Sequence, residues 1–91
     1  MDMVSLMITN DSDEIVVNIF CEEIGIDVAT ASDDLAYDSL KGWDSLKHLV
    51  IVSRLEEQFS LEFEVDDIIA MSTLGKVREI VARYIAEKRV I

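Results

Sequence analysis

A serine at the start of a predicted helix is the residue of this sequence best placed for chemistry. Asp44 is a good helix N-cap residue, and Ser45 would be the first residue inside that helix. At a helix start, unpaired backbone N–H groups point outward, and both these donors and the helix dipole favour an anion. The position of Ser45 therefore suits a phosphate.

The helix that Ser45 opens is predicted to run from about Ser45 to Phe59. Its apolar residues follow one another at spacings of three and four, which predicts a single buried face. They are Leu46, Leu49, Val52, Leu55 and Phe59.

Periodic patterns predict three more helices. Capping residues and an apolar stripe indicate a first helix over about residues 11–24, with Gly25 as its natural stop. Glu64–Met71 is predicted to be a short helix with Ile68 and Ile69 inward, and Ser72 or Thr73 to cap the last helix. The stripe of that last helix is Leu74, Val77, Val81, Tyr84 and Ile85.

The segment between Gly25 and Trp43 has no period and is predicted to be a long loop, with one short turn at Ser32–Leu35. The fold class is therefore all-α: a four-helix bundle of three long helices and a short third helix, with a long loop between helices one and two. Residues 1–10 are predicted to form an N-terminal tail, and residues 11–91 a single domain.

Composition excludes several functions. The 91 residues carry a formal net charge of −11, which argues against nucleic-acid binding and favours basic partner surfaces. The single cysteine, Cys21, forbids an internal disulfide, fits a reducing compartment, and is interpreted as a small buried hydrophobe. No signal peptide or membrane-spanning stretch is recognisable, so we expect a cytoplasmic monomer that does not insert into membranes.

Asp44–Ser45–Leu46 resembles the Asp-Ser-Leu motif of acyl carrier proteins and related thiolation domains, here of the freestanding type. Asp38–Ser39–Leu40 has the same three residues. In the family the serine opens the second helix, which ends about four turns later after a Leu-Glu-Glu-like run. Ser45 has that context, because Leu55–Phe59 stands at the far end of its helix. A helix begun at Ser39 would be interrupted by Gly42, so we interpret Ser39 as a loop residue.

The resemblance implies that Ser45 carries a covalent 4′-phosphopantetheine arm, which makes the chain a phosphoprotein. Asp44 would cap the helix and contact the transferase and its metal, and Leu46 would orient the helix or touch the transferase. The arm's thiol would carry acyl groups as thioesters between enzymes. The chain would be a carrier and not an enzyme, without catalytic residues. Its partners would be a phosphopantetheinyl transferase and acyl-loading enzymes, ketosynthases or other acyl-processing enzymes.

The pathway is open at this point. Lys47, His48 and Arg54 depart from the strongly acidic second helix of fatty-acid carriers, which favours a specialised pathway such as polyketide assembly over fatty acid biosynthesis. An aminoacyl or aryl carrier is an alternative within the same chemistry. An acidic helical adaptor without a prosthetic group is an alternative of another class.

Two other features have competing interpretations. His48 is interpreted as solvated or partner-facing rather than as a base. Met71, with Ile69 and Val52, is interpreted as core packing, or as the lining of a slot for an acyl chain. No cluster of ligand residues has the spacing of a metal site, so no metal is expected.

Overall fold

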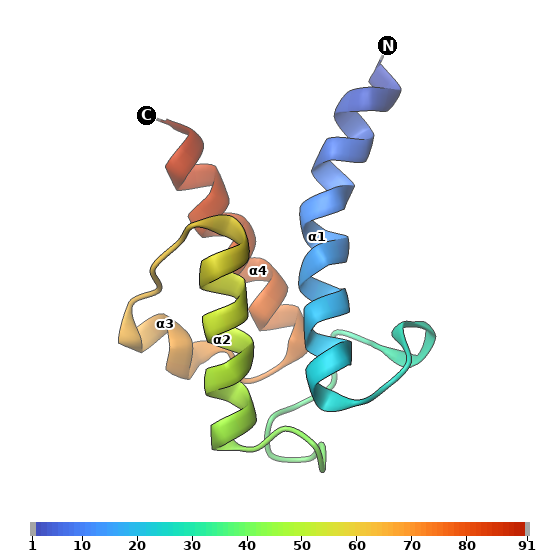
Figure 1. Ribbon diagram of the computed structural model, residues 1–91, viewed down its shortest axis with the longest axis vertical. Helices are drawn as coiled ribbons and strands as arrows, with labels where there is room; N and C mark the ends of the chain where they lie inside the picture. Colours follow the sequence, from blue (N-terminus) through green and yellow to red (C-terminus); the bar gives the residue numbers. More distant parts are fainter. Residues whose placement is uncertain (1, 91) are drawn as a thin grey trace.

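The computed structural model describes the backbone of residues 2–90 and the side chains of residues 12–88. It contains α1 (Asp2–Ile24), a 3₁₀ turn η1 (Val28–Thr30), α2 (Ser45–Phe59), α3 (Val65–Ala70) and α4 (Leu74–Val90). α1 packs against both α2 and α4, and the short α3 lies beside α2 (Figure 1). The predicted all-α bundle with a long loop between its first two helices is confirmed.

The first helix is longer than predicted. It begins at Asp2 rather than near residue 11, because no Gly or Pro interrupts residues 2–24 and capping-type side chains do not by themselves stop a helix. The division into a tail (1–10) and a domain (11–91) stays a prediction, and Met1 lies outside the described residues. Gly25 ends α1 as predicted, with a φ of 87° that a side chain would disfavour.

The core is aliphatic with an aromatic centre. Trp43, just before α2, is 2% exposed and meets the ring of Phe20 from α1 edge to face, with centroids 4.8 Å apart. Cys21 is buried beside them as a free thiol, as predicted. Burial, followed by the charge of Asp27, raises the pKa of this thiol. The remaining buried core residues are Val16, Ile19, Ile51, Val52, Leu55, Phe63, Met71, Leu74, Val77, Ile80 and Val81.

Backbone hydrogen bonds fasten the long loop to the segment between α3 and α4. The N–H of Tyr37 donates to the carbonyl of Ser72 at 2.9 Å, and the N–H of Leu74 donates to that of Leu35 at 2.9 Å. Within the loop, the N–H of Leu35 donates to Ser32 O at 3.1 Å, which closes the predicted turn. These bonds explain how a loop without a regular period is held in place and leads into α2.

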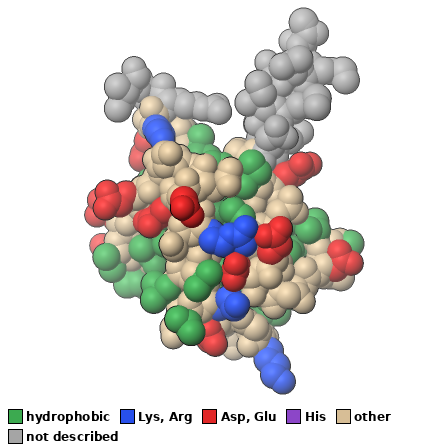
Figure 2. Space-filling model, viewed as in Figure 1, with side chains coloured by type: hydrophobic (Ala, Val, Ile, Leu, Met, Phe, Trp, Pro, Cys, Tyr) green, Lys and Arg blue, Asp and Glu red, His purple; other side chains and the backbone are tan. Residues whose placement is uncertain are grey.

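Charged and hydrophobic side chains are interspersed on the face of the molecule that Figure 2 shows. Figure 2 shows acidic side chains spread over one face, basic ones near its middle, and hydrophobic ones exposed over α3 and the start of α2. Arg54 of α2 pairs with Glu22 and Glu23 of α1, and Lys47 also pairs with Glu23. Within the described part of the chain, none of the helices combines the length and apolar character that crossing a membrane requires.

Candidate functional site

Asp44 fixes the start of α2. Its Oδ1 accepts a hydrogen bond from the N–H of Lys47 at 2.8 Å, and its carbonyl accepts one from the N–H of His48 at 2.8 Å. Its own backbone is extended, with φ −108° and ψ −176°. These are the bonds of an N-cap residue, so Ser45 is the first residue of the helix, as the sequence predicts.

The side chain of Ser45 is exposed and open to reaction. Among the described residues, its hydroxyl has no hydrogen-bond partner, and the backbone N–H groups of Ser45 and Leu46 have none either. The positive end of the α2 dipole lies at the same place. A phosphate bonded to this hydroxyl would therefore sit near free donors and a favourable field, without displacing an existing interaction.

The first turn of α2 does not bury the face that the sequence predicts. Leu46 is 72% exposed and Leu49 is 59% exposed, so the prediction of a continuous buried stripe is wrong at these two residues. The stripe is buried further along, at Val52 and Leu55. Steps of three residues fall short of the roughly 3.6 residues of a helical turn, so the stripe drifts around α2 and Leu46 points away from Leu55. Leu46 therefore lies at the surface beside Ser45.

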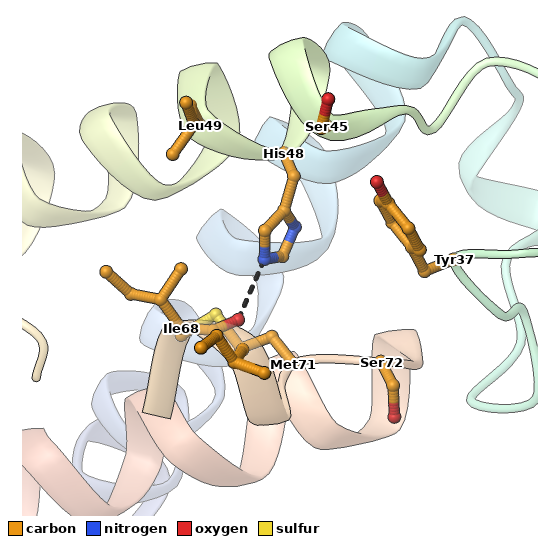
Figure 3. Close-up of a pocket in the computed structure, with 8 residues that line it drawn as sticks. Tyr37, Ser45, His48, Leu49, Ile68, Met71 and Ser72 are labelled. Carbon is orange, nitrogen blue, oxygen red and sulfur yellow. Dashed lines mark hydrogen bonds between the residues drawn. The ribbon is translucent and has the colours of Figure 1, made fainter. Parts of the chain in front are cut away.

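A groove of about 360 Å³ opens beside Ser45. Figure 3 shows Ser45 and Tyr37 on one side of it, Ile68, Met71 and Ser72 across from them, and His48 reaching from α2 toward Ile68. The lining comes from the long loop, α2, and α3 with the residues after it. It consists of Tyr37, Ser45, His48, Leu49, Ile68, Ile69, Met71 and Ser72.

The groove changes three expectations about the slot. Met71 is both core, at 1% exposed, and lining. Ile69 lines the groove from outside at 72% exposed, so its predicted inward orientation is wrong, because only one side of the two-turn α3 faces the core. Val52 belongs to the core and is not among the lining residues. Tyr37 and Ser72 were not predicted here, since they come from segments without a period.

His48 is half-buried and lines the groove, and the expectation of a solvated side chain is wrong because both ring nitrogens have partners within the protein. Its Nδ1 accepts a hydrogen bond from Trp43 Nε1–H at 3.0 Å, and its Nε2 lies 2.9 Å from the carbonyl oxygen of Ile68. Trp43 lies only five residues before His48, so a contact between them could have been considered from the sequence. The contact with Ile68 depends on the tertiary fold.

Ser39 is exposed like Ser45 but lacks its unpaired hydroxyl and its place at a helix start. It lies in a turn of the long loop, where its hydroxyl donates to Ala36 O at 3.4 Å and its backbone N–H donates to the same oxygen at 3.1 Å. It is not at the start of a helix. The structure therefore distinguishes the two Asp-Ser-Leu sequences by their surroundings.

Residues 14–83 match the family described as "Phosphopantetheine attachment site". The match extends from α1 into α4 and includes Ser45, its groove and the long loop. The chain belongs to this phosphopantetheine attachment family. Its prosthetic group is thus phosphopantetheine, and the domain is a carrier rather than an enzyme, as the resemblance implied.

Curated relatives are polyketide synthases. The chain is 34% identical over 67 residues to "Non-reducing polyketide synthase CTB1" of Cercospora beticola, which covers 74% of this chain and 3% of the relative. It is 34% identical over 64 residues to "Polyketide synthase 2" of Metarhizium guizhouense, covering 70% of this chain and 3% of the relative. It is 37% identical over 60 residues to "Polyketide synthase 2" of Metarhizium acridum, covering 66% of this chain and 3% of the relative. The chain thus matches only a small part of each of these proteins.

The surroundings of Ser45 fit the prosthetic group of the family. The hydroxyl is exposed, the adjacent N–H groups are free, and an apolar groove lies next to them. Within the described residues, no group of three or more His, Cys, Asp or Glu side chains is arranged to hold a metal ion.

Proposed function

We propose that Ser45 is the residue that bears the 4′-phosphopantetheine arm, and that the chain carries acyl intermediates on it as thioesters. The observation that supports this most strongly is the exposed, unpaired hydroxyl at the first residue of α2. Attachment joins Ser45 Oγ to the phosphate of coenzyme A as a phosphodiester and releases adenosine 3′,5′-bisphosphate. The hydroxyl proton passes to a base of the transferase.

Asp44 and Leu46 have separate parts in this proposal. Asp44 keeps Ser45 at the helix start by using Oδ1 for the cap, while Oδ2 has no partner among the described residues and can meet the transferase and its metal. Leu46, 72% exposed, offers an apolar contact next to the reacting hydroxyl. The transferase supplies the catalysis, so the chain only has to present a fixed, accessible serine.

Polyketide assembly is the pathway that the relatives favour over fatty acid biosynthesis. The three relatives are named polyketide synthases. The basic residues of α2 are weaker support for this pathway than the relatives are, because Lys47 and Arg54 are already paired with the glutamates of α1. The proposed partners are the transferase, acyl-loading enzymes, ketosynthases and other acyl-processing enzymes. We also keep the cytoplasm as the proposed location, because a chain with a single cysteine fits a reducing compartment.

The lining of the groove favours an acyl group over an aminoacyl group. Its walls are largely the apolar side chains of Leu49, Ile68 and Met71. None of its lining residues is acidic, so the groove offers no carboxylate to pair with the ammonium of an aminoacyl group. Loading the arm with acyl and aminoacyl donors in parallel checks this part of the proposal, which predicts greater retention of the acyl group.

The attachment itself is tested by intact mass. The protein is incubated with coenzyme A and a promiscuous phosphopantetheinyl transferase, alongside the variants Ser45→Ala and Ser39→Ala. We expect one arm on the wild type and on Ser39→Ala, and none on Ser45→Ala. An arm on Ser45→Ala would refute the assignment to Ser45. An unmodified wild type would instead favour the adaptor without a prosthetic group.

A further inference from the structure

Two side-chain hydrogen bonds in series connect the residue before the α2 cap to α3. Trp43 Nε1–H donates to His48 Nδ1 at 3.0 Å, and His48 Nε2 lies 2.9 Å from the carbonyl oxygen of Ile68. An indole can only donate and a carbonyl can only accept. The two bonds therefore require the imidazole tautomer with its proton on Nε2, which satisfies both neighbours at once.

Burial makes this arrangement difficult to break. Trp43 is 2% exposed, and among the described residues its indole N–H has no acceptor other than His48. Loss of that acceptor would leave a buried donor without a partner, which is costly. The ring centroids of Trp43 and Tyr37 lie 5.7 Å and 5.8 Å from that of the imidazole, so both rings pack near it.

The two side chains of the first hydrogen bond flank Ser45 in the sequence. Trp43 lies two residues before it and His48 three residues after it, so their hydrogen bond closes the first turn of α2 in addition to the Asp44 cap. The second bond reaches Ile68, which belongs to the opposite wall of the groove. One side chain thus connects the segment that holds Ser45 to the helix that faces it (Figure 3).

We propose that His48 is a positioning residue for attachment at Ser45. It holds the first turn of α2 and α3 at a fixed spacing, so that the serine hydroxyl and the groove wall are presented to the transferase as one rigid surface. This inference rests on the proposed function of Ser45. It assigns to the chain's single histidine a role that requires the neutral Nε2–H tautomer and not proton transfer.

The tautomer is tested first, on the unmodified wild-type protein. A long-range ¹⁵N–¹H spectrum of the imidazole should show a protonated Nε2 and an unprotonated Nδ1. A proton on Nδ1, or averaging between the two tautomers, would overturn the proposal, since neither state satisfies Trp43 and Ile68 together. This measurement needs no transferase, so its outcome is independent of the proposed function.

Two substitutions separate the two hydrogen bonds. In His48→Asn the amide oxygen can still accept from Trp43 but the side chain is too short to reach Ile68, whereas the longer amide of His48→Gln can donate to Ile68 O. We expect amide exchange in α3 to rise about tenfold in His48→Asn and to change less than about threefold in His48→Gln. Val16→Ala, a buried change in α1, is the matched control for a general loss of stability. An equal rise in His48→Asn and Val16→Ala would overturn the proposal.

The rate of attachment completes the test. With subsaturating protein, the kcat/KM of the transferase should fall about tenfold for His48→Asn and stay near wild type for Val16→Ala. It should recover in part for His48→Gln, which restores the bond to Ile68 but not the acceptor for Trp43. An unchanged rate for His48→Asn, or no recovery for His48→Gln, would overturn the positioning role. Failure of the proposed function is distinguishable, because the wild type would then accept no arm at all.

Discussion

Arg78 of α4 binds Asp13 of α1 through two parallel hydrogen bonds, from Nε to Oδ1 and from Nη2 to Oδ2, each 2.8 Å long. Its third nitrogen, Nη1, donates to Asp33 of the long loop. The two carboxylates, Asp13 more than Asp33, raise the pKa of Arg78. One guanidinium thus joins the first helix, the last helix and the loop, and its planar geometry is what allows this.

Replacing Arg78 with Lys should therefore destabilise the protein even though the charge is kept. We expect the free energy of unfolding to fall by about 1 kcal/mol, a modest value because the pair is partly exposed. Urea unfolding measures it. Lys76→Ala, which removes a 3.6 Å pair within α4, is the control and should change stability by less than about 0.5 kcal/mol. Equal effects of the two substitutions would contradict the bridging role.

For Gly75→Ala, helix propensity and packing predict stability changes of opposite sign. It lies in the first turn of α4, where helix propensity alone favours Ala by about 1 kcal/mol. A Cβ at this position would lie 3.0 Å from Asp33 Cβ and 3.2 Å from Asp33 O, so the loop would have to move. We expect Gly75→Ala to destabilise the protein in thermal unfolding. Ala82→Gly, at an exposed position of α4, calibrates the propensity contribution, and a stabilised Gly75→Ala protein would show that the loop does not pack as described.

Asp67 should make the free energy of unfolding depend on pH in the acidic range. Its carboxylate accepts hydrogen bonds first from the Tyr84 hydroxyl and then from Arg83, and both lower its pKa below the ordinary value of 3.8. The unfolded chain therefore takes up this proton at a higher pH than the folded chain does. The stabilisation is complete above about pH 4 and is lost as pH falls toward the lower folded pKa.

The test is urea unfolding at a series of pH values between about 5 and 2.5. Tyr84→Phe removes the larger cause of the shift, so the loss of stability with acid should be shallower than in the wild type. Tyr37→Phe is the matched control, because the Tyr37 hydroxyl has no hydrogen-bond partner among the described residues. A steeper acid dependence in Tyr84→Phe would mean that the hydrogen bond does not favour the ionised carboxylate.

Replacing Ser60 with glycine should stabilise the protein. It follows α2 in the left-handed region with φ 54°, which costs a residue with a side chain roughly 1 kcal/mol. Ser60→Gly should raise the free energy of unfolding by about 0.5 kcal/mol, net of the extra freedom of glycine in the unfolded chain. Ser53→Gly, at an exposed position inside α2, should have the opposite sign. A destabilised Ser60→Gly protein would contradict the strain at this position.

Local signals in the sequence predicted the elements that hold the site. The Asp44 cap, the start of α2 at Ser45 and the stop at Gly25 all follow from nearest neighbours in the chain. Capping and glycine effects act within about one helical turn. Such features can therefore be predicted without knowing which helices pack together.

Most of what could not be predicted depends on distant contacts. Leu46 and Leu49 were expected inside and lie outside for a local reason, because steps of three residues drift around a helix of roughly 3.6 residues per turn. The role of His48 depends on Ile68, 20 residues away. The glycine at position 75 is explained only by the approach of Asp33 from the loop. Neither of these two long-range contacts, His48 with Ile68 and Gly75 with Asp33, leaves a periodic trace in the sequence.

The central claim, that Ser45 bears the arm, is tested most directly by peptide mass after modification. Trypsin cleaves after Lys41 and Lys47, so Ser45 falls in the short peptide Gly42–Lys47 while Ser39 falls in the peptide that ends at Lys41. After incubation with coenzyme A and a phosphopantetheinyl transferase, the mass of the arm should appear on the peptide Gly42–Lys47 alone. The arm on the peptide ending at Lys41, with Gly42–Lys47 unmodified, would contradict the account.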